Sequence, residues 1–231
     1  LLQSNYFIAE STYWQRPTKK SYRSARQKYK DLIEENPHSK WAEKSQFSIG
    51  WTHFSEAAIS NDRERTDHYN RAISTWKTMI QKYPESKLLD QSLYQIGVSQ
   101  SNLKKYSEAI QSFKRMITLY TSSSWQDNSQ YQIGWAFYKL EEYGNAIDAF
   151  SEVIRKFPSS RLQPNAIFGI ANCYFKQGRY TNAINEYKKV VENYPNLKKL
   201  DLRGNFLADK TKNALRSSFS HLKSLRIFQS E

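Results

Sequence analysis

A tyrosine recurs every 37 residues through the central part of this chain. Each tyrosine opens a similar phrase, in which alanine follows three positions later and an aromatic residue seven positions later. The four tyrosines are Tyr69, Tyr106, Tyr143 and Tyr180. A repeat of this length predicts an array of similar units, each packed on its neighbours. Such an array favours a binding function over catalysis.

One complete unit lies between Leu88 and Tyr120. Its first half carries residues at spacings of three and four, which share one face of a helix. These residues are Leu89, Leu93, Ile96 and Gly97. The short polar segment 102–105 suits a turn, and a second apolar stripe begins at Tyr106. The unit is therefore predicted to be two antiparallel helices of about 14 to 16 residues each. Each of the four recurring tyrosines is expected to mark the start of a second helix.

Small residues occupy matching positions in both helices. They are Gly50, Gly97, Gly134 and Ala171 in the first helices, and Ala72, Ala109, Ala146 and Ala183 in the second helices. A glycine inside a helix costs about 0.5–1 kcal/mol relative to alanine. Because the glycines recur in register, they predict a close contact between helices.

The second helices are predicted to end at prolines, because proline lacks the N–H and disfavours helical geometry in the residue before it. The prolines are Pro37, Pro84, Pro158 and Pro195. A serine two positions later is expected to cap the next helix. These serines are Ser39, Ser86 and Ser160.

The repeated phrase resembles the tetratricopeptide repeat. The residues that carry the resemblance are Gly97, Tyr106, Ala109, Phe113 and the ending Tyr83-Pro84. The standard repeat has about 34 residues. The longer spacing here is similar to that of bacterial envelope proteins, such as the lipoprotein of the outer-membrane barrel assembly machine and the periplasmic partner of the Tol-Pal system. The resemblance covers Trp41 to Pro195.

The predicted fold is all-α: a right-handed solenoid of about five helical pairs with a closing helix. Residues 1–40 are expected to form a degenerate pair, 41–197 to hold four units (41–84, 88–121, 125–158 and 162–195), and 198–231 to form one or two basic closing helices. The apolar residues of those closing helices are Phe206, Leu207, Leu215, Phe219, Leu222 and Leu225. The extra segment 56–67 is expected to lengthen a helix or to protrude as a loop. It stays open whether that segment binds a partner or is a simple surface excursion.

The sequence shows no catalytic or metal-binding pattern. The four histidines, which are His38, His53, His68 and His221, include no pair at the spacing of a helical metal site. Cys173 is the single cysteine and lies in an apolar helix pattern, so it is interpreted as a buried residue. We therefore expect no enzyme activity, no cofactor, no metal and no small-molecule substrate.

Large aromatic residues on the first helices are the candidate partner-binding residues. If the tetratricopeptide register holds, these helices line a concave groove that takes a peptide or helix of a protein partner. Nonrepeating aromatics suit such contacts, because they give much contact area at low entropic cost. The predicted partner-binding residues are Trp51, Phe54, Trp135, Tyr138, Lys139, Asn172, Phe175 and Lys176.

The net charge of +13 is concentrated at the two ends. The candidate basic residues are Arg16, Lys19, Lys20, Arg23, Lys198, Lys199 and Arg203. They could meet an anionic membrane surface, an acidic protein or nucleic acid, or they could simply be solvated. Nucleic acid is disfavoured, because Tyr22 and Tyr29 between the basic residues are already explained as a helix core stripe.

The function expected from the sequence is that of a non-enzymatic scaffold. By resemblance, it would act in an envelope assembly complex, in the bacterial periplasm or on the periplasmic face of the outer membrane. A cytoplasmic location stays an alternative, and no apolar run approaches the roughly 18 residues of a membrane span. The other interpretation that stays open is a spacer or self-association module of a larger chain, since the sequence does not begin with methionine.

Overall fold

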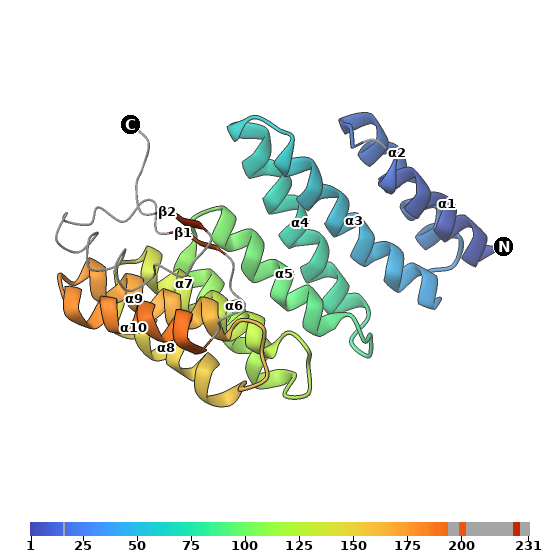
Figure 1. Cartoon of the computed structure of the whole chain (residues 1–231). Coiled ribbons are helices and arrows are strands. Elements are labelled where there is room, and N and C mark those ends of the chain that lie inside the picture. The colour runs from blue at the N-terminus through green and yellow to red at the C-terminus, as the bar shows by residue number, and fades with distance from the viewer. Residues whose placement is uncertain (16, 194–198, 202–223, 227–231) are drawn as a thin grey trace. The chain divides into compact units, whose positions relative to one another are not determined.

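The structure, a computed structural model, describes residues 1–15, 17–193, 199–201 and 224–226. The chain divides into two compact units, Leu1–Ser129 and Gln130–Glu231. The first unit holds α1 (Leu2–Trp14), α2 (Lys19–Glu35), α3 (Lys40–Ala58), α4 (Asp62–Lys82), α5 (Leu89–Asn102), α6 (Tyr106–Leu119) and the start of α7 (Gln126–Lys139). The second unit holds the rest of α7, then α8 (Tyr143–Lys156), α9 (Gln163–Lys176), α10 (Tyr180–Asn193), β1 (Lys199–Asp201) and β2 (Ser224–Arg226) (Figure 1).

Helices that follow one another in the chain pack side by side within each unit. In the first unit this holds for every step from α1 to α6, and α1 also touches α3. In the second unit α9 packs against both α8 and α10. From α5 onward each helix has 14 residues. The prediction of an all-α solenoid of tetratricopeptide type is confirmed.

The recurrent glycines lie against aromatic rings of the second helices. A Cβ added to Gly50 would come within 2.3 Å of Trp76, and one added to Gly97 would come within 2.6 Å of Phe113. Trp76 is fully buried and its Nε1 donates a hydrogen bond to the carbonyl oxygen of Phe47. The close contact predicted from the glycines is thus confirmed, and its partner is a ring rather than a helix backbone.

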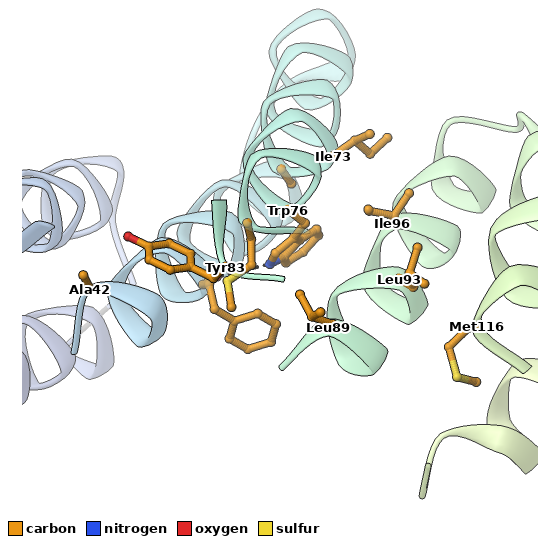
Figure 2. Packing of buried hydrophobic residues seen from close by; sticks show 11 residues of the cluster. Ala42, Ile73, Trp76, Tyr83, Leu89, Leu93, Ile96 and Met116 are labelled. Atoms are coloured by element: carbon orange, nitrogen blue, oxygen red, sulfur yellow. Dashed lines mark hydrogen bonds between the residues drawn. The ribbon is translucent and has the colours of Figure 1, made fainter. Parts of the chain in front are cut away.

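One hydrophobic cluster of the first unit gathers around Trp76. It extends from Ala42 on α3 to Leu89, Leu93 and Ile96 on α5. Figure 2 shows Trp76 between Tyr83 on one side and the α5 side chains on the other. This packing fixes the positions of α3, α4 and α5 relative to one another.

The helix ends agree with the proline prediction where the structure describes them. Helices α2, α4 and α8 end at Glu35, Lys82 and Lys156, each two residues before a proline. Ser39 caps α3, since its side chain accepts a hydrogen bond from the Ala42 N–H. Pro195 lies outside the described residues.

The predicted serine caps of α5 and α9 are wrong in detail. Ser86 and Ser160 accept hydrogen bonds from the N–H groups of Leu88 and Leu162, which are the residues at the helix caps. The serines therefore order the turn just before each helix. The physical reason is that each serine oxygen bonds the N–H two residues later and so makes no bond to the first helical turn of the kind that Ser39 makes in α3.

The extra segment 56–67 lengthens two helices rather than forming a loop. Helix α3 runs for 19 residues and α4 for 21, and Asn61 caps α4 by accepting from the Glu64 N–H. Tyr69 consequently lies inside α4, so the expectation that it begins a second helix is wrong. Tyr106, Tyr143 and Tyr180 do begin their helices.

The C-terminal segment departs from the predicted closing helix where it is described. Residues Lys199–Asp201 and Ser224–Arg226 form a parallel pair of short strands, with Leu200 opposite Leu225. Leu225 was expected on a helix and instead lies in β2, because the pairing with β1 supplies backbone hydrogen bonds that a helix would form internally. The other apolar residues of the predicted closing helices lie outside the described residues.

Candidate functional site: an aromatic pocket around Glu10

A pocket of about 400 Å³ opens in the first unit. Four helices build it: α1, α2, α3 and the start of α5. Its lining residues are Tyr6, Glu10, Tyr13, Trp14, Tyr29, Lys44, Phe47, Ser48, Trp51, Leu88 and Gln91. The volume lies in the range of ligand-binding pockets. Many aromatic rings with a few converging polar groups are also typical of such pockets.

The carboxylate of Glu10 is held by four hydrogen-bond donors. Its Oε1 accepts from the hydroxyls of Tyr6 at 2.9 Å, Tyr29 at 2.6 Å and Ser48 at 3.1 Å. Its Oε2 accepts from Trp14 Nε1 at 3.2 Å. These donors come from three helices, so Glu10 joins α1, α2 and α3 at the pocket wall.

The tyrosines around Glu10 are held in their neutral form. Burial and the adjacent Glu10 raise the pKa of Tyr6 to about 12. Burial and the hydrogen bond to Glu10 raise the pKa of Tyr29 strongly. Both phenols therefore remain hydrogen-bond donors over the whole neutral pH range.

Glu10 has hydrogen bonds but no cationic partner in the part of the chain that the structure describes. Lys44 is the cationic residue in the pocket lining. Its Nζ lies 5.9 Å from the centre of the Tyr6 ring and 4.9 Å from the Trp41 ring. The pocket thus combines a carboxylate without an ion pair and several aromatic faces, which is the combination that attracts a cationic group.

Trp51 and Phe54, predicted as partner-binding residues, have different surroundings. Trp51 is half-buried, lines the pocket and contacts the rings of Phe47 and Trp76. Phe54 packs against Tyr69 and Trp76 and does not line the pocket. Of these two residues, the structure brings only Trp51 to the site.

The predicted residues on α7 form a separate aromatic cluster in the second unit. Trp135 packs edge-on against Tyr131, Tyr138 and Phe150, and both Trp135 and Tyr138 are half-buried. Burial raises the pKa of Tyr138 to about 12. Lys139 is exposed beside them.

Two of the three predicted residues on α9 are buried in the packing between helices. Asn172 is only 5% exposed and its Oδ1 accepts a hydrogen bond of 2.6 Å from the Tyr187 hydroxyl. Phe175 is buried against Tyr180, whereas Lys176 is exposed. Asn172 and Phe175 offer little surface to a partner, because they fill the contact between α9 and α10.

The candidate basic residues of the N-terminal end lie on the surface of α2. Lys19 forms an ion pair of 2.7 Å with Glu64, and Lys20 and Arg23 are exposed. Arg16, Lys198 and Arg203 lie outside the described residues. Lys199 lies in β1. No helix in the described residues is both long and apolar enough to cross a membrane.

Three potential metal ligands meet where the sequence predicted none. His53 and Glu56 on α3 lie beside His68 on α4, with one ligand atom of each within 4.8 Å of the others. Histidine spacing in the sequence indicates only metal sites that lie within one helix. The lengthened α3–α4 pair brings His53 and His68 together from two helices instead.

The pocket residues of α1 were missed because they do not belong to the 37-residue repeat. One signal pointed to them: Glu10 is the only charged residue among the first 15. A carboxylate in an otherwise uncharged helix needs partners when it is partly buried. Tyr6, Tyr29 and Ser48 supply them.

Comparison with known proteins agrees with the fold and with the repeat. The family model of an outer membrane lipoprotein, YfiO, matches residues 88–168, and a tetratricopeptide repeat model matches residues 165–197. No curated protein matches the sequence.

Several solved structures share the fold. MamA from Desulfovibrio magneticus RS-1 is 13% identical, with a TM-score of 0.64 over 85% of this chain and 96% of that chain. PilF from Pseudomonas aeruginosa is 13% identical, with a TM-score of 0.60 over 95% and 84% of the two chains. YrrB, described as a TPR protein with an unusual peptide-binding site, is 14% identical, with a TM-score of 0.55 over 77% and 80%. The chain therefore has the fold of tetratricopeptide repeat proteins, with residues 165–197 matching that repeat and residues 88–168 matching the outer membrane lipoprotein family.

Proposed function

We propose that this chain is a non-enzymatic scaffold that binds a segment of a protein partner, and that the aromatic pocket holds a lysine or arginine side chain of that segment. The observation that carries the proposal is the Glu10 carboxylate, which lies among aromatic rings in a pocket of about 400 Å³ without a cationic partner from the described residues. The description of YrrB as peptide-binding supports this class of ligand.

The pocket favours a cationic side chain on two grounds. A guanidinium or ammonium group within about 6 Å of an aromatic centroid gains about 0.5–2 kcal/mol, more when it is desolvated. Glu10 adds a charge-assisted hydrogen bond, because its Oε2 accepts only from Trp14 Nε1. Aromatic residues such as Trp51 then supply the apolar contact area typical of binding hot spots.

The aromatic cluster on α7 is proposed as a second contact for the same class of partner. Trp135 and Tyr138 are half-buried and Lys139 is exposed beside them, so an acidic residue of the partner could pair with the lysine. Lys176 on α9 would act in the same way. Trp135→Ala together with Tyr138→Ala should weaken binding without loss of helicity.

The cellular setting is proposed as the bacterial envelope, with the chain on the periplasmic side as part of an assembly complex. The match of residues 88–168 to an outer membrane lipoprotein family supports this setting. Fractionation of source cells tests it directly. Recovery with the cytoplasmic fraction alone would contradict it.

A displayed library of random 12-residue peptides tests the binding proposal on the full chain. We expect enrichment of peptides with lysine or arginine flanked by apolar residues. The selected peptide should bind Glu10→Gln and Trp51→Ala about tenfold more weakly, which corresponds to about 1.4 kcal/mol.

Phe7→Ala is the matched control. Phe7 lies on the same helix as Glu10, is 55% exposed and does not line the pocket. This variant should bind like the unaltered chain. Enrichment of acidic peptides, or equal affinity of Glu10→Gln, would reject the pocket as a cation site.

A further inference from the structure

A second group of polar side chains lies on the elongated α3–α4 pair, away from the aromatic pocket. His53 and Glu56 are three residues apart on α3, and His68 projects from α4. The Glu56 side chain is 3% exposed, and the His68 side chain is 14% exposed. None of the three lines the aromatic pocket.

The distances within this group suit a shared metal ion. His68 Nε2 lies 3.7 Å from Glu56 Oε1, and His68 Nδ1 lies 3.5 Å from His53 Nδ1. Two ligands that each lie about 2.0–2.1 Å from a tetrahedral zinc ion are about 3.3 Å apart. Nε2 of His68 faces Glu56 and its Nδ1 faces His53, so a single His68 nitrogen must turn toward the ion; one ligand atom of each residue lies within 4.8 Å of the others.

Arg26 on α2 completes the surroundings of Glu56. Its Nη1 lies 2.5 Å from Glu56 Oε2, on the oxygen that does not face His68. A carboxylate that binds a metal through one oxygen is commonly oriented by a hydrogen bond to the other. Arg26 thus fixes Glu56 in the position that leaves Oε1 for the ion.

The charges near the site both help and oppose a cation. Glu56 supplies a negative charge to the ion, whereas Arg26, its ion-pair partner, is a nearby positive charge. Lys30 and Arg71 also act on His53, although Arg71 is paired with Asp67 at 2.7 Å. These cations should make binding weaker than at structural zinc sites with thiolate ligands.

We propose that His53, Glu56 and His68 form a zinc site that links α3 to α4. Two imidazoles and one carboxylate are a donor set that zinc favours, and the fourth position would be open to water. The partial exposure of His68 gives the ion a path to the site. Such an ion would tie together the two helices that the extra segment lengthens.

Zinc titration of the full, tag-free chain against a chromophoric chelator tests the proposal. We expect one zinc ion per chain and a higher melting temperature in the presence of zinc, because a ligand that binds only the folded state stabilises it. His53→Ala and His68→Ala should each lower the zinc affinity by about tenfold or more. Cobalt should give a d–d absorption spectrum that His68→Ala abolishes.

His38→Ala is the matched control, since His38 is exposed and does not belong to the cluster. It should bind zinc like the unaltered chain. Far-UV circular dichroism in chelator establishes that each variant is folded, and the cobalt spectrum of the folded variants then decides. Absence of stoichiometric binding, unchanged affinity in both cluster variants, or an equal loss in His38→Ala would overturn the site.

Discussion

Gly134 lies so close to Phe150 that a Cβ added to the glycine would come within 2.5 Å of the ring. Gly169 approaches the other edge of the same ring, where an added Cβ would come within 2.7 Å. Phe150 is fully buried between them. Gly134 on α7 and Gly169 on α9 thus make room for one aromatic residue on α8.

Gly134→Ala should destabilise the second unit by about 1–3 kcal/mol, the usual cost of overpacking a filled core. Urea unfolding followed by circular dichroism measures the change. Gly144→Ala in the same unit is the control, because a Cβ there meets nothing within 4 Å. It should raise stability by up to about 1 kcal/mol, since alanine is the better helix former. Equal effects of the two substitutions would contradict the packing argument.

Arg26→Ala should destabilise the first unit strongly. It leaves the Glu56 carboxylate, which is 3% exposed, without its ion-pair partner, and losing one partner of a buried pair costs about 3–5 kcal/mol. Chemical unfolding in the presence of chelator measures the effect without any contribution from metal.

Lys19→Ala is the matched control for the buried pair. Lys19 also forms an ion pair from α2, with Glu64, but both side chains of that pair are exposed. Such surface pairs contribute little to stability. A loss in Lys19→Ala as large as in Arg26→Ala would show that burial does not decide the cost.

The repeat could be predicted from the sequence because its signal is local and repeated. Gly97 and Phe113, for example, occupy fixed positions within one 37-residue repeat. The same contact therefore recurs in other repeats. The start of α4 could not be predicted from the repeat. Tyr69 keeps the repeat register, and yet the helix begins seven residues earlier, where Asn61 supplies the cap.

The candidate sites could not be predicted from the sequence for a related reason. Glu10, Tyr29 and Ser48 lie on three helices, and their meeting depends on how α1 packs, which no repeat specifies. Likewise His53 and His68 are 15 residues apart and meet only because α3 and α4 are both lengthened. Trp51 was found because a large aromatic residue at a repeat position is visible in the sequence itself.

Stability should fall at alkaline pH because of the tyrosines around Glu10. The pKa of Tyr6 is raised from 10.0 to about 12, and that of Tyr29 is raised as well. Below pH 10 both phenols are neutral in the folded and unfolded states, so their contribution is complete. Above pH 10 the unfolded chain loses these protons first, and stability declines as the pH approaches the folded-state pKa.

Urea unfolding at a series of pH values checks this, with Tyr29→Phe as the variant. It should lower stability at neutral pH by about 1.5–3 kcal/mol, the range for hydrogen bonds to charged groups, and should flatten the alkaline decline. Tyr106→Phe, on a half-buried tyrosine of the same unit, should keep the decline. An unchanged alkaline slope in Tyr29→Phe would contradict the role of Glu10.

Cys173 should resist thiol reagents as long as the second unit is folded. Its side chain is fully buried, and burial raises the pKa of the thiol to about 12, so the reactive thiolate is scarce at neutral pH. Ellman's reagent should therefore react slowly with the native chain and at once with the chain in guanidinium. Because reaction requires opening, Gly134→Ala should speed it by loosening the core that Cys173 shares with Phe150, whereas Gly144→Ala should not. Rapid reaction of the native protein would show that α9 exposes this thiol without unfolding.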